Sequence, residues 1–249
     1  MRILLINPNT SESITARLES AARTVMAPET QLDCVTAPTG VPYISTRTEA
    51  QIGGLQVLEI LAQRHADYDA AIVAAFGDPG LGAARELYDL PVVGLAEAGM
   101  LTACMLGGRF AILTFATALG PWYNECIAWH RLDSRCAGVF MPKGGFSSID
   151  NVQDERCERL VTLAGEIAAA GNADSIVLAG APLAGLAAKV RDRIALPVVD
   201  CAQAAICQAE TLARLRPAPA RAGSFARPAA KGSTGLMPAL AAQIDQTAS

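Results

Sequence analysis

Short apolar runs alternate with stretches of helical periodicity along most of the chain. Apolar residues recur at three- and four-residue spacing, as on one face of an amphipathic helix, over residues 11–26, 49–64, 154–170 and 202–216. Between them, apolar runs of strand length lie close to Gly, Asn, Asp or Pro, which predicts strands at 2–7, 70–76, 90–94, 110–114, 175–179 and 196–200. Strands alternating with helices in this way predict an α/β fold with mainly parallel sheets.

Two segments of the chain resemble one another. Residues 72–85, followed by Leu-Pro-Val-Val at 90–93, are echoed by residues 176–189, followed by Leu-Pro-Val-Val at 196–199. Each copy predicts a strand, a turn of small residues, a helix and a strand. Two Ala-rich units can also be similar by chance. If the repeat is real, it predicts two pseudo-symmetric lobes whose turns lie at the carboxyl ends of strands and flank one ligand cleft.

The rest of the chain sets the domain limits. Residues 216–231 are rich in Pro, Ala and Arg and lack periodicity, so we expect an extended arm, followed by a short helix near 236–244. The predicted division is a first lobe of residues 1–98 plus 208–249, with a returning C-terminal arm, and a second lobe of residues 99–207.

Composition narrows the class of partner. A net charge of -4 without a basic run gives no footprint for nucleic acid or anionic lipid, so a small-molecule substrate is expected. No export signal and no apolar run long enough to span a membrane is visible. The seven cysteines are an odd number and include no CxxC pair. Reduced thiols in a cytoplasmic protein are the simplest interpretation.

Two motifs follow predicted strands. Ile6-Asn-Pro-Asn-Thr-Ser11 opens a helix, so its polar side chains cap that helix or contact a ligand. Phe76-Gly-Asp-Pro-Gly80 places glycine at a strand-to-helix turn, which allows close approach of the backbone to a ligand. Together with residues 94–98, 108–114 and 181–185, these motifs resemble the hydantoin and allantoin racemases of the Asp/Glu racemase superfamily over nearly the whole chain.

This resemblance implies two α/β lobes, a cleft between them, a homo-oligomer, and neither metal nor organic cofactor. In such racemases, one cysteine from each lobe faces the α-carbon of the substrate, and the two thiols remove and return its proton. The positions that correspond to these cysteines hold Ala75 and Gly180. A racemase based on two thiols is therefore not expected.

Substitute catalytic groups are few. Cys201 follows a strand end, and Asp78 is either a general base or an Asx-turn residue before Pro79. We interpret the other cysteines as incidental thiols, with Cys136 in a loop. His65 and His130 are read as surface or packing residues, and no metal site or Cys–His dyad is evident.

The predicted substrate-binding set is polar and aromatic. Arg47 is expected to pair with a substrate carboxylate or in a surface ion pair. Ser45 stands where the racemases often carry Glu, and Phe115 departs from their usual Thr-rich stretch, which predicts a ligand of altered shape. The whole set is Asn9, Thr10, Tyr43, Ser45, Arg47, Ala75, Phe76, Gly77, Thr114, Phe115, Trp122, Gly180, Ala181 and Pro182.

Three functions remain open. The first is hydrolytic or eliminative chemistry on a hydantoin-like ring or small carboxylate, such as desulfuration of a thiohydantoin carboxylate. The second is racemisation or isomerisation with Asp78 or Cys201 as base. The third is a noncatalytic ligand-binding module.

Overall fold

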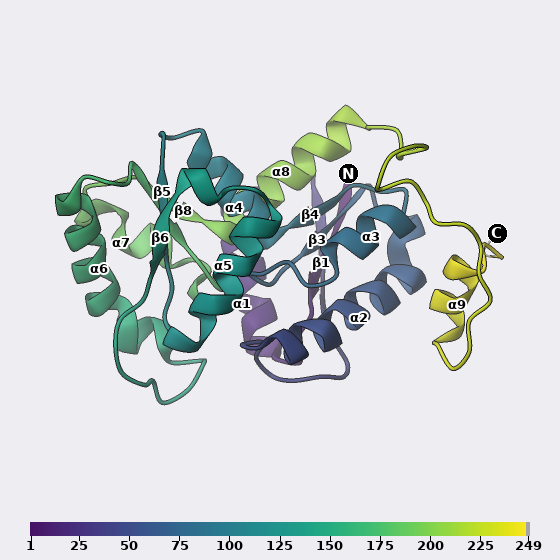
Figure 1. Cartoon of the computed structure of the whole chain (residues 1–249), viewed down its shortest axis with the longest axis horizontal. Coiled ribbons are helices and arrows are strands. Elements are labelled where there is room, and N and C mark those ends of the chain that lie inside the picture. The colour runs from purple at the N-terminus through teal and green to yellow at the C-terminus, as the bar shows by residue number, and fades with distance from the viewer. Residues whose placement is uncertain (248–249) are drawn as a thin grey trace.

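A computed structural model describes residues 1–247 and shows two α/β lobes side by side (Figure 1). The first lobe contains a parallel sheet of order β2-β1-β3-β4, and the second a parallel sheet of order β6-β5-β7-β8. The strands are β1 (Arg2–Asn7), β2 (Gln31–Thr36), β3 (Ala70–Val73), β4 (Val92–Gly94), β5 (Phe110–Leu113), β6 (Cys136–Phe140), β7 (Ser175–Leu178) and β8 (Val198–Asp200).

Helices cover both sheets, which confirms the predicted fold class. They are α1 (Glu12–Arg23), α2 (Arg47–Arg64), α3 (Leu81–Leu87), α4 (Leu95–Cys104), α5 (Gly120–Trp129), α6 (Val152–Ala170), α7 (Leu186–Val190), α8 (Cys201–Leu215) and α9 (Pro238–Ile244). Short 3₁₀ turns include η4 (Ala181–Leu183). Within residues 1–247, no helix is long and apolar enough to cross a membrane.

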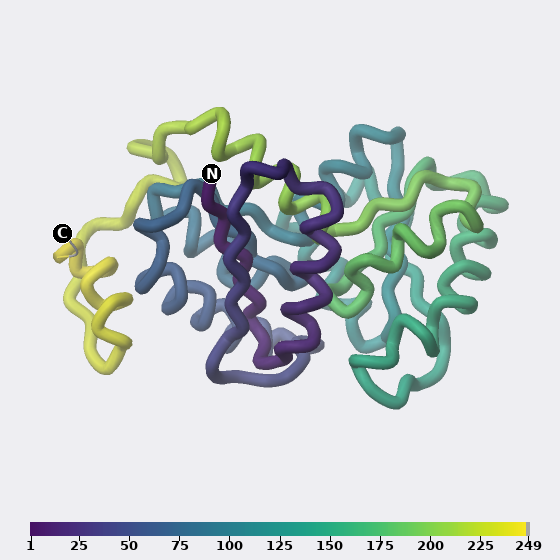
Figure 2. Tube along the Cα trace, turned by 180° about the vertical axis from the view of Figure 1, so that it is seen from behind, coloured from purple at the N-terminus to yellow at the C-terminus, as the bar shows by residue number. Residues whose placement is uncertain are grey.

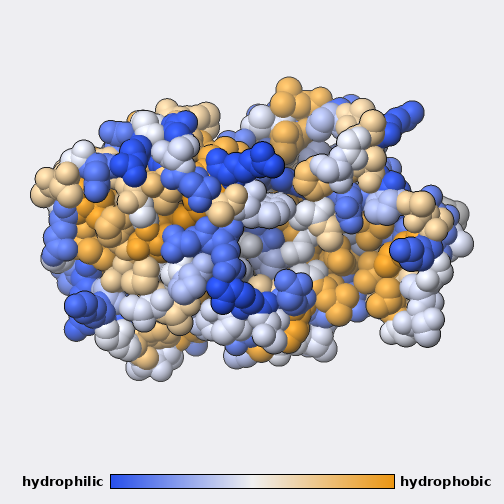
Figure 3. Space-filling view, viewed as in Figure 1, coloured by the Kyte–Doolittle hydropathy of each residue, from blue (hydrophilic) through white to orange (hydrophobic). Residues whose placement is uncertain are grey.

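The central strands are apolar because both of their faces are covered. The side chains of β3, β5 and β7 are buried along their whole length, as expected for parallel strands between helix layers. Strand β6 lies at a sheet edge and is half-buried throughout. Hydrophobic residues are visible on that side of the second lobe in Figure 3. Cys136 begins this strand, so its assignment to a loop was wrong.

The internal repeat forms equivalent parts of the two lobes. The segment β3-α3-β4 occupies the same place in the first sheet as β7-α7-β8 in the second. The carboxyl ends of β1 and β3 in one lobe and of β5 and β7 in the other therefore supply the residues of the site described below.

Helices α1, α4 and α8 connect the lobes. Helix α8 packs against α1 and α4 and against β3 and β4 of the first sheet, and α1 is seen at the lobe junction in Figure 2. The predicted domain limits at 98/99 and 207/208 fall inside α4 and α8. Beyond α8, the chain runs without helix to α9, which packs on α2. This course agrees with the predicted arm and final helix.

Candidate active site

The turns after β3 and β7 face the same small cavity between the lobes. Its volume is only about 20 Å³, which is room for about one water molecule. Ala75 and Gly180, the two positions that the resemblance assigns to catalytic thiols, both line it. The complete lining is Asn9, Tyr43, Ile44, Ala75, Phe76, Trp122, Tyr123, Gly180, Ala181 and Pro182.

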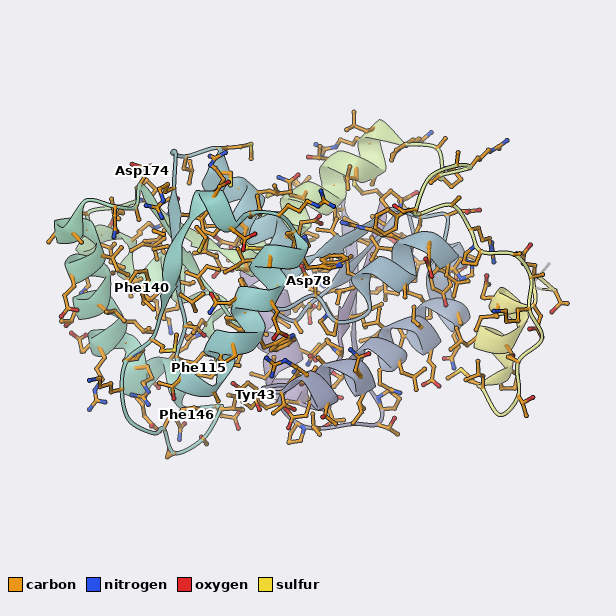
Figure 4. All side chains as sticks on the ribbon, viewed as in Figure 1. Tyr43, Asp78, Phe115, Phe140, Phe146 and Asp174 are labelled. Atoms are coloured by element: carbon orange, nitrogen blue, oxygen red, sulfur yellow. The ribbon has the colours of Figure 1, made fainter. Side chains whose placement is uncertain are left out.

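Aromatic side chains close the cavity. The ring centroids of Phe76 and Tyr123 lie 4.5 Å apart, and those of Tyr43 and Phe115 lie 5.9 Å apart. Phe115 also meets Phe146 edge to face, with centroids 5.6 Å apart. Figure 4 shows Tyr43, Phe115 and Phe146 gathered at one end of the lobe junction. Sequence reasoning missed Phe146, which comes from a loop whose contact with the site has no local sequence signal.

A buried arginine fixes the loop that carries Phe146. Arg156 of α6 is almost completely buried, and its guanidinium donates hydrogen bonds to the carbonyl oxygens of Lys143 and Gly144. Arg159 donates to the Lys143 carbonyl as well, at 3.0 Å. Helix α6 thereby holds the loop over the aromatic rings.

Gly180 has a backbone conformation and surroundings that favour glycine. Its φ of 113° and ψ of 132° lie in a region that residues with a Cβ rarely adopt. A Cβ atom at this position would lie 2.8 Å from Cε1 of Phe115 and 3.3 Å from the Tyr123 hydroxyl. The ring of Phe115 therefore stands beside the place that a side chain at position 180 would enter.

We expect Gly180→Ala to lower the free energy of unfolding by about 1–3 kcal/mol, because it combines backbone strain with overpacking against Phe115. Urea denaturation measures this change. The matched control is Gly165→Ala in α6, where a Cβ would meet nothing within 4 Å. That variant should be at least as stable as the wild type, since Ala has a higher helix propensity than Gly. Equal stability of Gly180→Ala and wild type would contradict the prediction.

Several backbone donors around the cavity lack an acceptor within the described residues. Within residues 1–247, the N–H groups of Phe76, Gly180 and Ala181 donate to no carbonyl or side-chain acceptor. The Tyr43 hydroxyl is buried and lacks a hydrogen-bond partner as well. Burial raises the pKa of Tyr123, and of Tyr43, well above the ordinary phenol value, so both phenols are neutral donors at neutral pH. The site can therefore hold a carbonyl or carboxylate oxygen.

The Asn-Pro-Asn motif is chiefly a network that shapes the turn after β1. The Asn9 side-chain oxygen accepts from the Ser11 N–H at 2.9 Å and from the Asn7 side-chain amide at 3.0 Å. Ser11 caps α1, and the Thr10 N–H donates to the carbonyl of Val41. Of these residues, Asn9 alone lines the cavity, so the motif serves both as cap and as cavity wall.

Several other residues of the predicted set lie outside the cavity. Ser45 is held by Glu49, which accepts from its N–H at 2.6 Å and from its hydroxyl at 3.0 Å. Arg47 forms an exposed ion pair with Glu125 across the lobe junction, the surface alternative considered above. Thr114 donates to the carbonyl of Ala179 at 3.0 Å and joins the two neighbouring strands.

The two candidate catalytic groups have partners away from the cavity. The Asp78 carboxylate accepts from the N–H groups of Ala96 and Glu97 at 2.8 and 2.9 Å, so it caps the start of α4. The Cys201 thiol is buried and donates to the carbonyl of Leu178 at 3.3 Å. Burial, with the charges of Asp200 and Asp78, raises its pKa well above the ordinary value. Both geometries favour structural roles.

The His130 side chain is buried in an ion network, although the residue as a whole is half-buried, so of the two earlier interpretations packing applies and surface exposure does not. Its Nε2 lies 2.9 Å from the Asp78 carboxylate, and its Nδ1 lies 3.5 Å from Glu97, which is also paired with Arg85. Burial alone would lower the pKa of His130, but hydrogen bonds and charges from Asp78 and Glu97 outweigh it and raise the pKa to about 9. The imidazole is therefore a cation at neutral pH.

The same network keeps Glu97 ionised. Burial would raise its pKa, but hydrogen bonds and charges from His130 and Arg85 lower the pKa to about 2. His65, in contrast, packs beside Tyr88 and contacts the Leu61 carbonyl at 2.8 Å, as the packing interpretation predicted.

The comparisons with known proteins agree with this architecture. Residues 3–209 match the Asp/Glu/Hydantoin racemase family. The hydantoin racemase of Paenarthrobacter aurescens is 31% identical over 93% of this chain and 99% of its own. The allantoin racemase structure from Klebsiella pneumoniae is 32% identical, with a TM-score of 0.89 over 96% of this chain and 98% of that one. An allantoin racemase structure from Pseudomonas fluorescens is 29% identical, with a TM-score of 0.87 over 94% of this chain and 100% of that one.

Proposed function

This chain belongs to the Asp/Glu/hydantoin racemase family, and on that premise we propose that it is an enzyme that binds a hydantoin-like ring between its lobes and acts on a ring carbonyl or thiocarbonyl carbon. One observation carries the proposal. The cavity between the two turns offers free backbone N–H donors and phenol hydroxyls, but its lining contains no thiol, carboxylate or imidazole.

Such a lining does not favour proton transfer at the α-carbon. Exchange from both faces of that carbon needs two positioned acid/base groups, and Ala75 and Gly180 offer none. The buried partners of Asp78 and Cys201 make these two poor substitutes.

The same lining suits addition of water to a polarised ring carbon. As water adds, negative charge develops on the carbonyl oxygen or thiocarbonyl sulfur, and fixed N–H donors stabilise it. At a thiocarbonyl carbon, departure of sulfide leaves a carbonyl in its place, so one water is consumed and one hydrogen sulfide is formed. At a carbonyl carbon, cleavage of the ring amide opens the ring.

A substrate ring can bind only if the aromatic side chains that close the cavity move. A volume of about 20 Å³ is too small for a five-membered ring, so Phe115 and the Phe146 loop, or the lobes themselves, move on binding. We expect substrates with a planar ring that packs against these aromatic side chains.

The direct experiment incubates the protein with thiohydantoin propionate and with a series of 5-substituted hydantoins. Sulfide release and ring opening are followed by colorimetric assay and liquid chromatography. The proposal predicts one of these products at a rate above buffer. No product from any ring would overturn the proposal and favour the noncatalytic alternative.

A variant tests whether the chemistry occurs in this cavity. Tyr43→Phe removes a buried hydroxyl without a protein partner, and we expect kcat/KM to fall about 3- to 10-fold, the effect of one hydrogen bond. Tyr88→Phe is the control, because its hydroxyl is bonded to the Leu58 carbonyl outside the cavity. Its kcat/KM should stay within about twofold of wild type. Equal effects of both variants would place the reaction elsewhere.

The noncatalytic alternative also has support from the structure. A closed cavity lined by no thiol, carboxylate or imidazole is compatible with a module that senses a ligand by opening. It predicts that hydantoins or dicarboxylates raise Tm without being consumed. Turnover of any of these ligands would exclude it.

A further inference from the structure

Three potential metal ligands from the two lobes meet beside the cleft. Cys126 and His130 stand four residues apart on α5 and its C-terminal end, so they project from the same face of the helix. Asp78 approaches them from the turn after β3. One donor atom from each of the three side chains lies within 4.8 Å of the other two. Figure 4 shows Asp78 next to α5, between the lobes.

These distances are close to what a tetrahedral metal ion requires. Zinc binds nitrogen and oxygen ligands at about 2.0–2.2 Å and sulfur at about 2.3 Å, which places its ligands roughly 3.3–3.7 Å apart. His130 Nε2 and Asp78 Oδ2 are 2.9 Å apart and would separate slightly, while the Cys126 sulfur would approach by at most about one ångström.

Neighbouring groups fix the orientation of the Asp78 and His130 side chains. The Asp78 carboxylate is fixed by two backbone N–H groups. Ala96 donates to Oδ1, and Glu97 donates to Oδ2, the oxygen that also lies beside His130. The second imidazole nitrogen, Nδ1, faces the Glu97 carboxylate at 3.5 Å, and Glu97 is held by Arg85. A carboxylate behind a metal-bound histidine is the usual arrangement that sets its tautomer and orientation.

The cluster has no net charge either with or without a dication. Without the ion, the His130 and Arg85 cations balance the Asp78 and Glu97 carboxylates, and burial keeps the Cys126 thiol neutral by raising its pKa. Binding of a dication releases one proton from His130 and one from Cys126, so the sum stays zero. A buried cluster without net charge avoids an uncompensated desolvation cost.

A second, larger cavity lies beside the three ligands. This cavity has a volume of about 630 Å³, and Asp78 and Cys126 belong to its lining together with Trp122, Trp129 and residues 79–83. It opens between α2, α3 and α5, on the other side of Trp122 from the small cavity. The Asp78 carboxylate and Cys126 are buried, so a water molecule or small anion from this cavity reaches the ion only when side chains of the lining move.

We propose that Asp78, Cys126 and His130 bind one zinc-class divalent ion that joins the two lobes and keeps an exchangeable fourth ligand. Among the described residues, this is the one set of three His, Cys, Asp or Glu side chains with such spacing. The site is separate from the Ala75 and Gly180 cavity, and the proposal does not depend on the ring chemistry proposed above.

Cobalt provides the test. The full chain is reduced, stripped with a chelator and titrated with Co²⁺. We expect saturation at one ion per chain, with a thiolate-to-cobalt charge-transfer band and the visible bands of a tetrahedral ion, and displacement of the ion by Zn²⁺. Cys126→Ala should abolish the charge-transfer band. Cys207→Ala, which removes an exposed thiol, should retain it.

A second measurement needs no variant and therefore does not depend on whether Cys126→Ala folds. X-ray absorption of the zinc-loaded wild type should show one sulfur at about 2.3 Å and three nitrogen or oxygen ligands at about 2.0–2.2 Å. In Glu97→Gln, affinity for the ion should fall about 10- to 100-fold. Absence of a stoichiometric cobalt complex, a charge-transfer band retained in Cys126→Ala, or zinc without one sulfur ligand would overturn the proposal.

Discussion

The variant Ala75→Cys/Gly180→Cys/Phe115→Thr is expected to exchange the α-proton of a 5-substituted hydantoin at least about 100-fold faster than the wild type, since positioned acid/base groups contribute factors of this size. Ala75 and Gly180 line the same cavity from opposite lobes, so thiols there would flank a bound ring. Phe115 must be shortened because its ring lies 2.8 Å from where a Cβ at position 180 begins. Deuterium incorporation from D₂O, followed by NMR, measures the exchange.

The matched control is Ala75→Ser/Gly180→Ser/Phe115→Thr, which has the same shape but lacks groups that ionise near neutral pH. It should exchange no faster than the wild type. Saturation-transfer NMR with the same hydantoin shows whether each variant binds the ring. Ring binding without faster exchange in the cysteine variant would contradict the interpretation of Ala75 and Gly180 as the former thiol positions.

Replacing His130 with Ala is expected to lower the free energy of unfolding by about 3 kcal/mol at pH 7, with chelator present. The imidazolium is the cation that faces the buried Asp78 carboxylate, and removing one member of a buried ion pair leaves the other uncompensated. The two N–H bonds that Asp78 keeps limit the loss to the lower part of the usual range. Urea denaturation provides the measurement.

His65→Ala is the control for this experiment, because that residue is partly exposed and its ring contacts the Leu61 carbonyl rather than a carboxylate. It should cost about 1 kcal/mol or less. His130→Gln keeps a hydrogen-bond donor without the charge and should lie between His130→Ala and wild type. A loss below about 1 kcal/mol in His130→Ala would show that the network contributes little to stability.

Most of the fold was predictable because both sheets are built from local β-α units. The periodicity of apolar residues, together with turn residues, predicted six of the eight strands and the long helices α1, α2, α6 and α8. Strands β2 and β6 lie at sheet edges. Gln31 and Asp33 interrupt the apolar run of β2, and β6 is apolar but only half-buried and includes Gly138. Helices α3 and α7 are too short for a periodic pattern to be distinct.

The site was predicted less completely, for a different reason. The turns after β1, β3 and β7 follow from strand ends and were found. The contacts of Asp78 with α4 and with His130 join residues 18 and 52 positions apart. No local sequence pattern indicates contacts between residues so far apart in the chain. The spacing of Cys126 and His130 on one helix face was the available sequence signal, and it gains meaning only when Asp78 is placed beside it.

The central claim is that the cleft acts on a ring carbon without moving the α-proton. The most direct measurement follows one enantiomer of a 5-substituted hydantoin, and its 2-thio analogue, with the wild-type protein in D₂O by NMR. The account predicts ring opening or loss of sulfur above the buffer rate, while the remaining ring gains deuterium at C5 no faster than in buffer. Faster deuterium incorporation into an otherwise intact ring would contradict it.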